Sequence, residues 1–157
     1  CIPIDPLFLT WIAKKNKLST KFISLSNKIN REMPNYIYKK FLNIKKKLEK
    51  FNILIVGIAY KKNIDDIRES PALKFMDLLT KDKIKFKYYD PYVKELNYNS
   101  KIIKSSKLNL IKKMKNCISI VITDHDKINF NLIKKYSKYI IDTRGRFKPN
   151  GENIVSF

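Results

Sequence analysis

Two short, strongly apolar segments restrict the fold of this chain more than any other feature. They are residues 51–57 and 117–123, and each is apolar on both faces, as a buried strand of a parallel sheet is. The other elements that the pattern predicts are strands at 85–90 and 139–142 and helices at 70–79, 108–114 and 130–136. This alternation predicts an α/β fold, with a Rossmann-like doubly wound parallel sheet over residues 51–157.

Residues 1–50 are predicted to form a separate, helical unit ahead of that domain. A helix can begin after Pro6, because proline is favoured in the first turn of a helix. Apolar residues then recur at intervals of three to four through residues 19–50, which predicts one long helix that Pro34 kinks near Met33. Such a helix would span ~45 Å, which suits a dimerisation surface or a strut between domains, and equally a solvated surface helix.

Glycine is too scarce for a standard dinucleotide site. The chain has three glycines, Gly57, Gly145 and Gly151. They cannot form the G-x-G-x-x-G turn, so this region is not expected to bind NAD in the usual way. Ligands of such sheets still bind beyond the carboxyl ends of the strands. The polar residues expected there are Tyr60, Lys61, Asp65, Asp66, Arg68, Glu69, Ser70, Asp90, Asp124, His125, Asp142, Arg144 and Arg146.

Lys61 and Arg144 are the strongest candidates for binding an anion. They follow the first and last of the strands predicted above, where both side chains would point at the mouth of the crevice. Two cations suit a ligand such as a diphosphate, and a helix that starts at Ser70 would add main-chain N–H donors. The alternative for Lys61 is that it is one of many solvated lysines, whereas arginine is rare here.

The other charged residues of these loops have a structural interpretation. The charged residues of 65–69 are expected to form a salt-bridge cluster that shapes the turn. His125, the only histidine, lies between two aspartates, and the favoured interpretation is a loop residue at a strand end. No second histidine or cysteine pair supports a metal, so no metal site is expected.

The formal charge of +20 raises the question of nucleic-acid binding. Only four of the 34 cationic residues are arginine, which specific nucleic-acid sites favour. Lysine, isoleucine and asparagine, whose codons are rich in A and T, dominate the composition. The charge therefore reflects a bias in genome composition, and no specific nucleic-acid partner is expected.

The cysteines and the hydropathy favour a cytoplasmic protein. Cys1 and Cys117 cannot make a disulfide framework, and Cys117 lies in an apolar run typical of a core. The apolar runs are shorter than the ~20 residues that a membrane-spanning helix needs. A reducing compartment and no membrane are therefore expected.

Several motifs resemble those of one enzyme family. Residues 1–11 (Cys-Ile-Pro-Ile-Asp-Pro, then Leu-Thr-Trp) resemble the catalytic-cysteine motif of the UDP-glucose/GDP-mannose dehydrogenase family. Residues 57–72 resemble its UDP-binding loop. Shorter matches in the order and spacing of the family are 30–34, 89–92, 123–125 and 142–144. The resemblance covers residues 1–148 and implies a central dimerising helix followed by a UDP-binding domain.

The resemblance also implies a reaction and roles for five residues. The reaction is an NAD-dependent, two-step oxidation of the C6 alcohol of a UDP-sugar to the uronic acid. Cys1 would form a thiohemiacetal and then a thioester, and Asp5 would orient or deprotonate the hydrolytic water. Tyr60 would pack near the ligand, Lys61 would contact the nucleotide, and Arg144 would reach the sugar or the diphosphate.

The resemblance implies a homodimer and leaves the sugar and the wider role partly open. Pro3 and the Leu-Thr-Trp sequence are most similar to the branch that oxidises UDP-N-acetylglucosamine, while UDP-glucose and UDP-N-acetylmannosamine stay open. NAD would be bound mainly by a domain ahead of Cys1, so the isolated piece is expected to be inactive. The alternatives are a non-catalytic UDP-binding or dimerising module and, less favoured, a basic nucleic-acid-binding domain.

Overall fold

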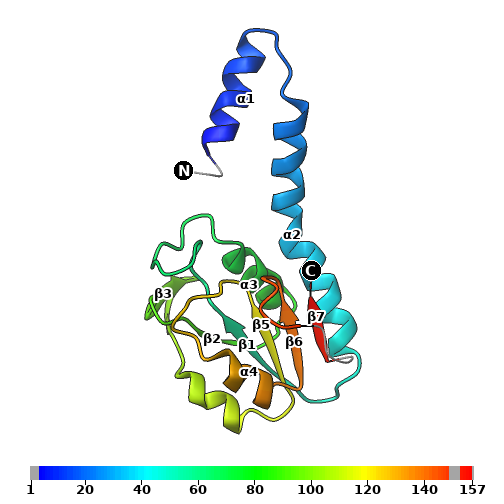
Figure 1. The fold of residues 1–157 in the computed structure, drawn as a ribbon, viewed down its shortest axis with the longest axis vertical. Helices are drawn as coiled ribbons and strands as arrows, with labels where there is room; N and C mark the ends of the chain where they lie inside the picture. Colours follow the sequence, from blue (N-terminus) through cyan, green and yellow to red (C-terminus); the bar gives the residue numbers. More distant parts are fainter. Residues whose placement is uncertain (1–3, 149–152, 157) are drawn as a thin grey trace.

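A five-stranded parallel sheet lies at the centre of the computed structural model, which describes residues 4–148 and 153–156 (Figure 1). In spatial order its strands are β2 (Lys87–Tyr89), β1 (Asn52–Val56), β5 (Cys117–Val121), β6 (Tyr139–Asp142) and β7 (Ile154–Ser156). The chain leaves β1 to form β2 on one side, and then crosses to form β5 on the other. The carboxyl ends of β1 and β5 are therefore the switch point, where ligands of such sheets bind.

Helices cover both faces of this sheet, as the alternation of strands and helices predicted. Helix α3 (Pro71–Lys81) and the second half of α2 (Lys21–Lys45) pack on the face that Ile53 and Ile55 share. Helix α4 (Phe130–Tyr136) and the 3-10 helix η1 (Leu108–Lys113) cover the face of Leu54 and Val56. The last four side chains of β1, at residues 53–56, are all buried, which explains why this strand has no polar alternation.

The N-terminal helices form a hairpin that extends beyond the sheet domain. Helix α1 (Asp5–Lys15) is followed by α2, in which Pro34 lies inside the helix. The strands point towards this hairpin, and the start of α1 is turned back towards the domain (Figure 1). Large apolar side chains of the hairpin remain exposed, among them Phe8, Trp11, Phe22, Leu25 and Ile29.

The structure differs from the sequence prediction in three places. A hairpin of β3 (Glu95–Tyr98) and β4 (Lys101–Lys104) precedes η1, where only a helix was expected. Strand β7 lies in a segment for which only a turn was predicted, and the predicted long helix ends at Lys45. Among the described helices, none is both long enough and apolar enough to cross a bilayer.

Candidate functional site

The loop after β1 packs directly against the loop after β5. Gly57 has a positive φ of 75°, and a Cβ atom there would lie 1.9 Å from the carbonyl oxygen of Thr123. The Thr123 hydroxyl donates a 2.6 Å hydrogen bond to the carbonyl oxygen of Ala59. The glycine that ends the apolar segment is thus required by this close approach, because neither the dihedral angle nor the space allows a side chain.

Asp90, directly after β2, holds the start of the β1 loop. Its buried carboxylate oxygen Oδ2 accepts hydrogen bonds from the backbone N–H groups of Ile58 at 2.7 Å and Ala59 at 3.2 Å. The other oxygen, Oδ1, accepts the N–H groups of Tyr92 at 2.8 Å and Val93 at 3.0 Å. The carboxylate is therefore a structural acceptor, since its oxygens are occupied by donors of the protein itself.

His125 is fully buried and uses both ring nitrogens. Its Nε2 lies 3.1 Å from Asp90 Oδ2, and its Nδ1 accepts the N–H of Asn63 at 2.8 Å. Because Nδ1 accepts a hydrogen bond, it carries no proton. The ring proton is therefore assigned to Nε2, which donates a hydrogen bond to Asp90. The ring is thus engaged on both sides. The described residues also contain no group of three or more potential metal ligands.

Asn63 and Asp126 complete the contact between the two loops. The Asn63 side chain donates to Asp126 Oδ2 at 2.6 Å and accepts the Asp126 N–H at 3.0 Å. Lys62 forms an ion pair with the same carboxylate at 2.6 Å. The hydrogen bonds from Lys62 and then Asn63 hold the pKa of Asp126 below its ordinary value. The backbone of Asn63 has a positive φ of 62°, which asparagine tolerates better than most residues.

Lys61 projects from this fixed loop with a free side chain. The preceding residue, Tyr60, is half-buried, and its N–H donates to the carbonyl oxygen of Asp66 at 2.7 Å. Lys61 is exposed, and no hydrogen bond or ion pair joins its ammonium group to another described residue. It differs in this respect from Lys62, and a free cation on an ordered loop suits an anionic ligand.

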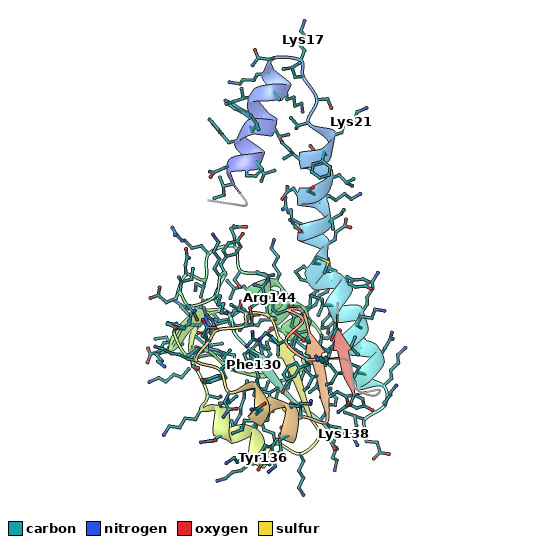
Figure 2. The ribbon with its side chains drawn as sticks, viewed as in Figure 1. Lys17, Lys21, Phe130, Tyr136, Lys138 and Arg144 are labelled. Carbon is teal, nitrogen blue, oxygen red and sulfur yellow. The ribbon has the colours of Figure 1, made fainter. Side chains whose placement is uncertain are left out.

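Arg144 lies at the same edge of the sheet, after β6. Its Nε is 3.7 Å from Asp124 Oδ1, and Nε of Arg146 is 3.9 Å from the other oxygen of that carboxylate. The two guanidinium groups therefore share one acidic partner and keep a net positive charge. Figure 2 shows Arg144 at the end of the domain nearer the helical hairpin, while Tyr136 and Lys138 lie at the opposite end.

The remaining predicted residues have structural roles or lie elsewhere. Arg68 donates to both oxygens of Asp66, at 2.9 and 2.8 Å, and lowers the pKa of that carboxyl to about 2. This confirms a salt bridge in the charged loop. Cys117 is buried as predicted, and burial raises the pKa of its thiol to about 11. Asp5 is exposed in the first turn of α1, whereas Cys1 lies outside the described residues.

The sequence predicts Asp90 and His125 at strand ends, but it indicates neither the contact between them nor any role for Asn63. The bonds of Asn63 to His125 and Asp126 connect residues more than sixty positions apart, so no local pattern reveals them. The sequence does contain one indication, an asparagine in the loop after the first strand, because asparagine is enriched at turn positions with a positive φ.

Comparison with known proteins identifies the family. Residues 54–149, more than half of the chain, match the sequence model of a family described as "UDP-glucose/GDP-mannose dehydrogenase family, UDP binding domain". The chain belongs to this family. The predicted resemblance is thereby confirmed, and the switch point described above lies within the matched residues.

The relatives differ in the sugar after which they are named. The chain is 33% identical to UDP-N-acetyl-D-mannosamine dehydrogenase of Methanococcus vannielii over 162 residues, covering 96% of this chain and 35% of that protein. It is 26% identical to NDP-N-acetyl-D-galactosaminuronic acid dehydrogenase of Ralstonia solanacearum, covering 92% and 34%. The chain thus spans about a third of the length of these relatives. Neither name is that of the UDP-N-acetylglucosamine branch, which the first motif favoured.

Solved structures of the family have the same architecture. UDP-D-ManNAc dehydrogenase from Pyrococcus horikoshii superposes with a TM-score of 0.74 at 28% identity, covering 99% of this chain and 37% of that one. GDP-mannose dehydrogenase from Pseudomonas aeruginosa gives 0.75 at 18% identity, covering 99% and 38%, which bears on the fold alone. The predicted fold class, a helical segment followed by a Rossmann-like sheet, is confirmed.

Proposed function

We propose that this chain supplies the helical and UDP-binding parts of a nucleotide-sugar 6-dehydrogenase, which oxidises a UDP-sugar to its uronic acid. The observation that carries the proposal is the family match over residues 54–149, which spans the switch-point loops. Lys61 and Arg144 would neutralise the diphosphate, and Tyr60 would pack beside the nucleotide. Residues 51–157 would form the UDP-sugar-binding domain, and residues 1–50 the segment that carries the catalytic cysteine and the dimer surface.

The chemistry that this chain would supply is nucleophilic and hydrolytic. The thiolate of Cys1 would add to the sugar aldehyde, with a proton going to the aldehyde oxygen, and would leave again when water cleaves the later thioester. Asp5 would orient or deprotonate that water. Both oxidation steps need a hydride acceptor, NAD in this proposal. The three glycines of this chain do not fit a dinucleotide turn, so the cofactor would bind to residues outside it.

The substrate class that we propose is a UDP-N-acetylhexosamine. UDP-N-acetylmannosamine is the first candidate for the substrate, because relatives that match almost the whole of this chain are named after it. UDP-N-acetylglucosamine, which the motif at residues 1–11 favours, is the second candidate. Formation of the uronic acid from each sugar by the full natural protein, compared through kcat/KM, distinguishes the two.

The binding site is tested by two substitutions and a matched control. Lys61→Ala and Arg144→Ala are each expected to weaken UDP binding by about tenfold, since each removes a charge-assisted contact to the diphosphate. Lys138→Ala removes the same charge at the opposite end of the domain and is expected to leave the affinity within about twofold (Figure 2). The measurement is calorimetric titration of the full natural protein with UDP at physiological salt.

Two results would count against this site. Equal affinity of the wild type and both site variants would remove Lys61 and Arg144 from the ligand contacts. If Lys138→Ala weakened UDP binding equally, the affinity would depend on the net charge of the domain, an effect that salt screens, and not on a specific site.

The exposed apolar face of the hairpin is proposed as a homodimer interface. The side chains of Phe22, Leu25 and Ile29 are 81%, 55% and 51% exposed and lie on one side of α2. Replacing both Phe22 and Ile29 by serine is expected to weaken self-association at least about tenfold, because large apolar anchors dominate such interfaces. Sedimentation equilibrium measures the effect, with Ser24→Ala on the opposite side of the helix as the control. A monomeric wild type, or an unchanged dimer in the double variant, would contradict the proposal.

A further inference from the structure

The contacts between the loops after β1 and β5 form a chain that starts inside the domain and ends beside Lys61. Asp90 accepts the Nε2 proton of His125 at 3.1 Å, and His125 Nδ1 accepts the N–H of Asn63 at 2.8 Å. Asp90 and His125 are fully buried, so neither can touch a ligand in this arrangement. They can therefore affect binding only through the loop that they hold, His125 through Asn63 and Asp90 also through Ile58 and Ala59.

The backbone on both sides of Lys61 is fixed by this network. On the amino-terminal side, the Ala59 N–H donates to Asp90 at 3.2 Å, and its carbonyl oxygen accepts from Thr123 at 2.6 Å. On the carboxyl-terminal side, Asn63 is held by His125 and Asp126. Few residues remain between these anchors, so the position of the Lys61 backbone is set before any ligand arrives.

Such an arrangement has an energetic consequence for binding. The neighbouring Lys62 uses its ammonium group on Asp126, which leaves Lys61 as the cation of this loop that is free for a ligand. A loop that is ordered in the free protein does not lose backbone entropy on binding, so more of the contact energy appears as affinity. Loosening the loop should therefore weaken binding without removing any group that touches the ligand.

We propose that His125 and Asn63 are positioning residues, which hold the segment of Lys61 in the geometry that binds the diphosphate of the nucleotide. Asp90 fixes the tautomer of His125, so that Nδ1 is the acceptor. This inference rests on the proposed function, because it takes Lys61 as a contact to the nucleotide.

A pair of substitutions at His125 separates positioning from general stability. An asparagine amide can place an acceptor near the position of Nδ1, and so keeps the bond to Asn63. A glutamine amide reaches the position of Nε2 and leaves the Asn63 N–H without its acceptor. His125→Gln is expected to weaken UDP binding by about fivefold, and His125→Asn by less than about twofold, although both lose stability from the buried ring.

Asn63→Gly provides a second variant that does not disturb the core. Glycine tolerates the positive φ of 62°, and the substitution deletes only the side-chain hydrogen bonds of Asn63, which are two with Asp126 and a longer one of 3.5 Å from the Tyr92 hydroxyl. It is expected to weaken UDP binding by about fivefold with little change in the thermal midpoint. Because Asn63 is exposed, this variant decides the outcome if the His125 variants do not fold.

The decisive measurement repeats these titrations in a Lys61→Ala background, using the full natural protein and UDP. If Asn63 and His125 act through Lys61, their effects on affinity disappear in that background. Equal weakening with and without Lys61, equal effects of the two His125 variants, or an unchanged affinity in Asn63→Gly would each overturn the positioning role. Unchanged affinity in Lys61→Ala itself would overturn both this role and the proposed site, which distinguishes the two failures.

Discussion

Gly57→Ala is expected to reduce the free energy of unfolding by about 4 kcal/mol, the largest loss of stability expected from one methyl group in this chain. The added Cβ would lie 1.9 Å from the carbonyl oxygen of Thr123, which belongs to the backbone and cannot rotate away. It would also force a positive φ of 75° on a residue with a side chain. Relief requires the loops after β1 and β5 to separate, which breaks the contact at the switch point.

Gly145→Ala is the matched control for this prediction. Gly145 has a similar φ of 67°, but nothing lies within 4 Å of the position of its Cβ. Its substitution should cost about 1 kcal/mol, which is the strain of the dihedral angle alone. Denaturant unfolding of both variants measures the difference. Similar losses at the two glycines would mean that the close approach to Thr123 relaxes without cost.

The central sheet could be predicted because its strands are buried on both faces. Such strands need apolar residues without alternation, which is what residues 53–56 contain and, apart from the buried Ser119, residues 117–121 as well. The hairpin of β3 and β4 could not be predicted in the same way. Its turn is made by Asn99 and Ser100, both at positive φ, and these strands lie outside the main sheet. Strand β7 has only three residues, too few for a periodic pattern.

The site was predictable only where strand ends determine it. Lys61 and Arg144 follow β1 and β6, so the topology alone brings both to the carboxyl edge of the sheet. The shared carboxylate of Asp124 could not be foreseen, since the position of a side chain within a loop depends on tertiary contacts. The same holds for Asp90, whose five N–H donors come from three separate segments.

Asp90→Asn is expected to destabilise the fold by about 3 kcal/mol, although the two side chains have nearly the same shape. In the wild type, Oδ2 accepts the N–H groups of Ile58 and Ala59 and the Nε2 proton of His125. An amide nitrogen at the position of Oδ2 is itself a donor, so its protons would face three buried donors that have lost their acceptor. The loss therefore comes from unsatisfied donors and not from a cavity.

The opposite orientation of the new amide does not restore the network. Its nitrogen would then face the N–H groups of Tyr92 and Val93, which the wild-type carboxylate accepts through Oδ1. A change of tautomer at His125 would also leave two donors facing each other, because a proton on Nδ1 would point at the N–H of Asn63. Every arrangement leaves at least one pair of buried donors opposed.

The stability of Asp90→Asn is measured by urea unfolding against Asp65→Asn, an exposed aspartate of the β1 loop. The control is expected to stay within about 0.5 kcal/mol of the wild type. A loss at Asp90 as small as at Asp65 would show that the five donors find other acceptors, and the buried carboxylate would then not be what joins these loops. A large loss together with weaker binding of UDP would tie the stability of the switch point to the affinity of the site, because the same carboxylate orients His125 and the segment of Lys61.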